Sequence, residues 1–326
     1  MRSGRYLFVV AASILQLSGC NETFEPKGPY AEKVVIYSIL TTMSDTQYVR
    51  IYRTYDPSGF NPLEVSSDNA IDGAQVSVTG ESETYQFHDT TIVRSDKSRY
   101  QTDIKAYVAY GFSVVRGKTY SLRARIGDGS EYTTSINIPA DANILTNGFN
   151  SLAFPHLLSD DDLVSFRIQL SSFTQGFIGQ VFLEYDLFVD STWTRTREEI
   201  PLGLRNFVDC RHFDSVYPQL QRRSGVQQEQ LLYQVLNYKT ILRKIWNVYG
   251  SNVRMKQVVF ELMQFEPNLY NYYNIAHGFN DEFSIRTDVP DFTNILGAHG
   301  VFGAWTRQSL AVSIPETTGM SLSCGN

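Results

Sequence analysis

The feature that most constrains the fold is a period-two alternation of apolar and polar residues between residues 33 and 139. Residues 120–126 place Tyr, Leu, Ala and Ile on one face and Ser, Arg and Arg on the other. Such a strand has one face on a core, because successive side chains point to opposite faces of a sheet. The β-branched run at residues 34–40 is typical of a strand buried on both faces. With turn signals between the runs, the pattern predicts an immunoglobulin-like β-sandwich over residues 31–140.

The second half of the chain predicts another, larger β domain over residues 150–326, after a linker at residues 139–150. Its expected strands are followed by a short helix after Pro267 and a last strand over residues 292–314. The period changes to about 3.6 within residues 226–249, which predicts one amphipathic helix. The fold class is therefore mainly β, with a helical insertion in the second domain. The apolar positions of the predicted helix are Leu231, Val235, Tyr238, Leu242, Ile245 and Tyr249.

The N-terminus predicts export. Arg2 and Arg5 precede an apolar stretch at residues 6–17, which is shorter than the roughly 20 residues of a permanent membrane span and has the form of a signal-peptide core. It ends in the letters LSGC, which resemble a bacterial lipobox. We expect residues 1–19 to be a cleaved lipoprotein signal peptide, Cys20 to carry the lipid, and residues 20–31 to form a tether. The alternative is an ordinary signal peptide with a chance cysteine.

Charge and the remaining cysteines narrow the setting. Removing residues 1–19 takes away two arginines, so the mature chain has 26 basic and 34 acidic residues and a charge of −8. This excludes nucleic-acid binding, which requires clustered Lys and Arg. Asn21 stands where an Asp would retain a lipoprotein at the inner membrane, which favours the outer membrane, on either face. Cys210 and Cys324 either pair in that oxidising compartment or remain separate thiols.

No motif for phosphate, dinucleotide, zinc or nucleophile chemistry is present, so the sequence predicts no catalytic residue, metal or cofactor. Residues 160–162 are three aspartates, which read as an acidic turn or as part of a calcium site. Tyr270, Tyr272 and Tyr273 are either a stacking platform for a ligand or packing between helix and sheet. Gly297, Gly300 and Gly303 predict a bend or bulge in the last strand. The five histidines show no metal-ligand spacing: His88, His156, His212, His277 and His299.

The order of these segments resembles the DUF4249 family of exported lipoproteins of the Bacteroidota. A lipobox and a β-sandwich half are followed by a Tyr-rich turn at residues 260–273, and residues 293–304 read TNILGAHGVFGA. The closing pattern carries most of the resemblance, which extends over nearly the whole mature chain. His299, in a stretch that is usually glycine-rich, and the polar segment at residues 219–230 depart from the family. The family has no assigned activity, so the resemblance implies a setting rich in TonB-dependent transporters and no catalytic residues.

These observations favour a lipid-anchored binding or accessory protein over an enzyme. A sandwich presents loops from a rigid scaffold, and the lipid confines the chain to a membrane surface. We expect a partner at the outer membrane such as a TonB-dependent transporter or a related surface complex, and no nucleic acid. Two alternatives are open: a surface hydrolase whose site is assembled from dispersed Asp, Glu and His residues, and a purely structural envelope lipoprotein.

Overall fold

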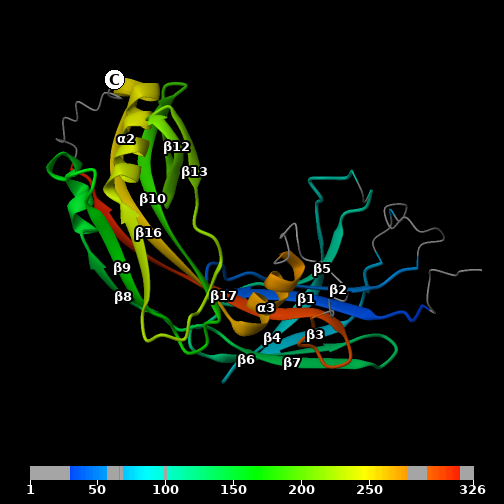
Figure 1. Cartoon of the computed structure of the whole chain (residues 1–326). Helices are drawn as coiled ribbons and strands as arrows, with labels where there is room; N and C mark the ends of the chain where they lie inside the picture. The colour runs from blue at the N-terminus through cyan, green and yellow to red at the C-terminus, as the bar shows by residue number, and fades with distance from the viewer. Residues whose placement is uncertain (1–29, 57–65, 67–68, 99–100, 278–291, 316–326) are drawn as a thin grey trace, which may run out of the picture.

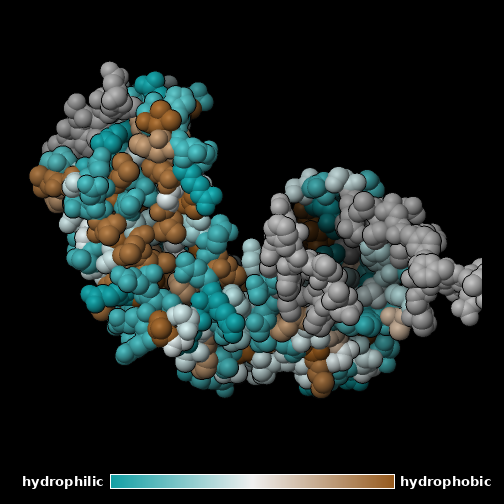
Figure 2. Space-filling model, in the orientation of Figure 1, coloured by the Kyte–Doolittle hydropathy of each residue, from teal (hydrophilic) through white to brown (hydrophobic). Residues whose placement is uncertain are grey.

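The computed structural model describes residues 30–56, 66, 69–98, 101–277 and 292–315, and these residues form a mainly β protein, as predicted. Figure 1 shows two lobes set at an angle to each other, with long strands running from one lobe into the other. Hydrophobic and hydrophilic residues are interspersed over the visible face of the C-terminal lobe in Figure 2. Among the described residues, no helix combines the length and the apolar character needed to cross a membrane.

The N-terminal lobe is a β structure of two layers that share one strand. Its strands follow the order β17-β1-β2-β5-β4-β3-β6-β7. The shared strand is β4, in which Phe87 pairs with β3 and the next residue, His88, pairs with β5. The fold class is confirmed, and the immunoglobulin-like arrangement in its details stays a prediction. The bounds are β1 Val34–Thr41, β2 Gln47–Arg53, β3 Gln75–Thr79, β4 Thr84–Ile92, β5 Ile104–Ala109, β6 Thr119–Arg125, β7 Glu131–Asn137 and β17 His299–Ser313.

The core of this lobe lies between the layers and follows the predicted alternation. Along β6 the residues are alternately exposed and buried, with Tyr120, Leu122 and Ala124 inside. Apolar side chains of β1, β2, β3 and β17 complete the same cluster. Strand β6 therefore contributes every second side chain to the interior, as the period of two predicts. Strands β1, β5 and β17 also bury runs of consecutive residues, as expected of strands covered on both faces.

The C-terminal lobe packs a helix and a small sheet against the long strands. Its hydrophobic core includes Phe166 of β9, Phe260 of β16 and Tyr238 of α2. The small sheet has the order β15-β9-β8. The bounds are β8 Asn143–Asn147, η2 Asn150–Ala153, η3 Pro155–Leu157, β9 Leu163–Gln169, β10 Gly176–Val189, β11 Thr192–Ile200, β12 Gly203–Asp209, β13 His212–Val216, β14 Gln221–Arg222, β15 Glu229–Gln234, α2 Val235–Tyr249, η4 Gly250–Asn252, β16 Val253–Phe265 and α3 Pro267–His277.

Two sequence expectations are corrected in this lobe. The predicted helix at residues 226–249 begins only at Val235, because residues 229–234 form β15 and pair with β9. The predicted linker at residues 139–150 contains β8, which pairs with the other edge of β9. Residues 229–234 and 143–147 are short segments that are polar on one face. They form strands because each pairs with one edge of β9.

Strand β17 connects the lobes. Its first part pairs in parallel with β1, with Gly300 opposite Ile36, and its second part pairs antiparallel with β16, with Leu310 opposite Phe260. Phe302 accordingly belongs to the N-terminal core. That the chain divides into two domains near residues 140–150 stays a prediction. The hydrophobic cluster of the N-terminal lobe includes residues from both sides of that boundary.

Candidate ligand-binding site

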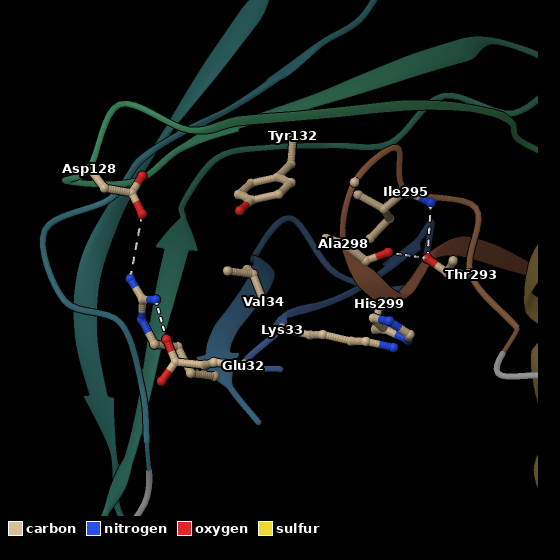
Figure 3. Close-up of a pocket in the computed structure, with 11 residues that line it drawn as sticks. Glu32, Lys33, Val34, Asp128, Tyr132, Thr293, Ile295, Ala298 and His299 are labelled. Atoms are coloured by element: carbon tan, nitrogen blue, oxygen red, sulfur yellow. Dashed lines mark hydrogen bonds and ion pairs between the residues drawn. The ribbon is translucent and has the colours of Figure 1, made fainter. Parts of the chain in front are cut away.

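A pocket of about 530 Å³ opens at one end of the N-terminal lobe, within the roughly 300–1,000 Å³ typical of ligand sites. Four chain segments surround it: the start of β1, the end of β2, the β6–β7 turn with the start of β7, and the loop that leads into β17 (Figure 3). Its lining residues are Glu32, Lys33, Val34, Arg53, Asp128, Tyr132, Thr293, Ile295, Gly297, Ala298 and His299.

The loop at residues 293–298 is held by its own short hydrogen bonds. The Thr293 hydroxyl donates to the Ala298 carbonyl at 2.9 Å and accepts from the Ile295 N–H at 3.1 Å. The Asn294 side chain bonds both backbone groups of Phe302 in β17, at 2.7 and 3.0 Å. The closing segment of the sequence therefore builds one rigid wall of the pocket.

Two glycines of this segment are required by the backbone. Gly300 has a φ of 101°, and a Cβ atom there would lie 2.1 Å from the Ile36 carbonyl oxygen of β1. Gly297 has a φ of 80° and faces the Tyr132 ring. The sequence predicted a bend, and both positive φ values are local bends, but Gly300 also allows a close approach of two backbones. Gly303 leaves room for Leu269 of α3.

The floor of the pocket is apolar. Val34, Ile295 and Ala298 are each less than a tenth exposed, and the Tyr132 ring lines the same pocket (Figure 3). The Leu296 N–H donates to the Thr133 carbonyl of β7 at 3.3 Å, so the loop seals against the edge of that strand. Little of this floor is open to water, so a ligand packed on it would bury mainly its own apolar surface.

The rim of the pocket is charged. The Arg53 guanidinium lies 2.5 Å from a Glu32 oxygen and 3.7 Å from an Asp128 oxygen. The Ser130 N–H donates to Asp128 at 2.8 Å, and this bond and the Arg53 charge hold the Asp128 pKa below its ordinary value. Lys33 forms no ion pair with any described residue. The Glu32 and Asp128 carboxylates are thus both paired with Arg53, whereas the Lys33 ammonium pairs with no described carboxylate.

This rim does not resemble a hydrolase pair. Such a pair needs one carboxyl with a raised pKa to act as an acid and one ionised partner. The pKa of Asp128 is lowered instead of raised, and Glu32 pairs with the same Arg53 side chain. Burial raises the pKa of two carboxyls outside this rim, Glu199 and Glu266. The pKa of Glu266 rises to about 7, and this carboxylate accepts N–H bonds from Asn268 and Leu269 at the start of α3, inside the protein.

The three tyrosines proposed as a platform do not share one exposed face. Tyr270 is 7% exposed and packs against Gly176, where a Cβ would meet its ring. Tyr272 donates to the Tyr37 hydroxyl at 2.9 Å, and the Tyr37 ring stacks on Tyr52. Tyr273 is 46% exposed. Packing between α3 and the sheet therefore accounts for two of the three rings.

The other predicted site residues lie apart from the pocket. Cys210 is buried and disulfide-bonded, and Cys324 lies outside the described residues, so their pairing stays a prediction. Cys20 also lies outside them. Asp160 pairs with Lys239 of α2 at 2.9 Å, as an acidic turn would. No group of His, Cys, Asp and Glu suited to a metal occurs in the part of the chain that the structure describes.

Sequence reasoning identified the closing segment but missed the charged half of the pocket. Glu32, Arg53 and Asp128 each stand in ordinary strand ends or turns, and only the tertiary fold brings them together. The available signal was the Gly-Asp-Gly turn at residues 127–129, which reads as a turn and nothing more.

Comparisons with known proteins give a family and no activity. The family model described as "Domain of unknown function (DUF4249)" matches residues 21–311. A search of curated proteins finds no match. Among solved structures, the adhesin InvE of Yersinia pseudotuberculosis is 11% identical, with a TM-score of 0.22, 90% of this chain covered and 62% of that one. The C-terminal globular domain of an oligosaccharyltransferase from Pyrococcus abyssi is 7% identical, with a TM-score of 0.21, 70% of this chain covered and 47% of that one. The chain thus spans less than two thirds of either structure.

Proposed function

The chain belongs to the DUF4249 family, and on that premise we propose that it is a lipid-anchored binding protein of the outer membrane. In this role it is an accessory partner of a TonB-dependent transporter or a related surface complex, and it contributes capture or assembly. The observation that carries the proposal is the pocket, which is built by the closing segment of the sequence at the end of the lobe where the tether enters.

The position of the pocket relative to the lipid supports this role. Glu32, Lys33 and Val34 line the pocket and follow directly on the tether. The chain between Cys20 and Tyr30 spans at most roughly 35 Å. A ligand held in the pocket is therefore kept near the membrane surface, where the tether also raises the effective concentration of the protein toward membrane partners.

The chemistry of the pocket supports binding over catalysis. An apolar floor with a few polar groups at the rim is the usual composition of a ligand site. Its two carboxylates both pair with Arg53, and the pKa of Asp128 is lowered, whereas the acid of an acid–base pair needs a raised pKa.

The lipid anchor is tested by replacing Cys20 with Ala and fractionating cells. We expect the variant to leave the membrane fraction. If C20A remains as firmly bound as the wild type, the anchoring part of the proposal is wrong.

The partnership is tested by a mild-detergent pull-down of the native lipoprotein, with C20A as the matched control. We expect a transporter barrel to co-purify with the wild type and to be lost or strongly reduced with C20A. Repeated recovery of the protein alone, with the transporter intact in the same extract, would contradict the partnership.

A further inference from the structure

We propose that the pocket at the tether end binds a small apolar carboxylate, with its apolar group on Val34, Ile295 and Ala298 and its carboxylate at Lys33. This inference rests on the proposed function only in taking the pocket to be a binding site, and it names the chemical class of the ligand.

The apolar part of the ligand follows from the floor. Val34, Ile295 and Ala298 come from two different segments and converge on one surface, opposite the Tyr132 ring (Figure 3). The floor is fixed before a ligand arrives, because Thr293 and Asn294 hold the loop through the bonds described above. A preformed apolar surface favours a ligand with a compact aliphatic or aromatic group, which loses no binding free energy to ordering the protein.

The negative charge of the ligand follows from which charged side chains of the rim are already paired. Arg53 already neutralises Glu32 and Asp128. A cationic ligand would have to displace Arg53 from one of these two carboxylates. An anionic ligand displaces nothing at Lys33, which makes no ion pair with the described residues. His299 also lines the pocket, so its lining includes a second nitrogen-bearing side chain.

The volume of the pocket, about 530 Å³, limits the ligand to a small molecule. Arg53, Glu32 and Asp128 are already joined by ion pairs, so Lys33 is left as the cation for the carboxylate of the ligand. A fatty acid and the carboxyl end of a peptide share this chemistry.

The first test compares matched probes on the full-length lipidated protein in mild detergent, by saturation-transfer NMR titration. The probes are N-acetyl-L-phenylalanine, its uncharged amide, and hexanoate. We expect the acid to bind at least about fivefold more tightly than the amide, because a charge-assisted contact is lost. Tighter binding of hexanoate would assign the site to acyl chains, and tighter binding of the acetylated amino acid would assign it to peptide ends. Equal binding of acid and amide, or no binding, would overturn the proposal.

The second test uses Lys33→Gln, with Lys33→Arg as the conservative variant and Lys105→Gln as a matched control on another exposed lysine of the same lobe. We expect K33Q to weaken binding of the acid to the level of the amide, and K33R and K105Q to keep it. Unchanged thermal melting of K33Q separates lost binding from lost folding. If K33Q binds the acid as tightly as the wild type, the assignment of the carboxylate to Lys33 is wrong.

The two proposals fail in different ways. A transporter recovered in the pull-down, with no selectivity between acid and amide, would refute the ligand class and leave the partnership standing. Selective binding of the acid, with no transporter recovered, would refute the partnership and leave the ligand class standing.

Discussion

The two lobes enclose their cores by different means. The N-terminal lobe faces one layer of strands with another, and its core includes residues from both ends of the described chain, such as Ile36 and Phe302. The C-terminal lobe covers long strands with α2 and a small sheet, and its core comes from residues 142–314 alone. The candidate site lies in the N-terminal lobe, and the walls of its pocket come from segments that are far apart in the chain. Pairing segments far apart in the chain is what allows a loop, a strand end and a turn to meet around one pocket.

The comparison is tested most strongly by one core deletion in each lobe. Phe302 and Phe260 are both fully buried, in the N-terminal and C-terminal cores respectively. Replacing either with Ala should lower the free energy of unfolding by about 3–5 kcal/mol. Because β17 runs through both lobes, we expect each variant to shift one common transition in urea, followed by circular dichroism. Two transitions, each moved by one variant only, would show that the lobes unfold independently.

The next test concerns the parallel pairing of β17 with β1. Gly300→Ala places a methyl group where the Ile36 carbonyl already lies, so we expect a loss of about 3 kcal/mol. Gly297→Ala is the control, since it has a similar positive φ but meets only the Tyr132 ring at 3.7 Å, and should cost about 1–2 kcal/mol. Both are measured by urea unfolding. Equal losses would mean that the close approach of the two strands is not what makes Gly300 necessary.

A third test uses the buried carboxyl at the start of α3. Burial raises the folded-state pKa of Glu266 from 4.5 to about 7. The folded protein therefore holds this proton more tightly than the unfolded chain, and the stability that this contributes is lost as pH rises from about 4.5 to about 7. We expect a loss of about 2–3 kcal/mol across that window, measured as unfolding free energy against pH.

The control for this test is Glu266→Gln, which cannot ionise. Its stability should not show this fall between pH 5 and pH 7. If the wild type and E266Q have parallel profiles, Glu266 does not titrate in that range.

The smallest expected losses of stability come from removing ion pairs. The loss should be smaller for an exposed pair in the N-terminal lobe than for a more buried pair in the C-terminal lobe. Arg53→Gln removes an exposed pair in the N-terminal lobe and should cost less than about 1 kcal/mol. Arg197→Gln leaves Glu261, which is only 10% exposed, with Arg307 at 3.4 Å as its remaining described partner. We expect R197Q to cost more than R53Q and to depend less on salt, in thermal unfolding at low and high ionic strength. The reverse order would contradict the role given to burial.

The candidate site was only partly predictable. The closing segment at residues 293–304 stood out as a glycine-containing pattern, and it forms a wall of the pocket. Tyr270, Tyr272 and Tyr273 also stood out, yet they are divided between the interior and the surface, because neighbouring residues of a helix point in directions about 100° apart. The chemistry of Arg53 could not be anticipated, since its two partners lie 21 residues before it and in the distant β6–β7 turn.

The sequence by itself determined the local structure. The period of two in β6, the boundaries of β16 and the proline that begins α3 all follow from side-chain direction and backbone stereochemistry, which act over a few residues. Only the tertiary structure decided that β17 pairs with β1, that Glu266 is buried, and that Lys33 lines a pocket without an ion pair to any described residue. Those outcomes depend on contacts between residues far apart in the chain, such as Ile36 and Gly300, which are 264 positions apart. No local pattern encodes the partner of a strand edge.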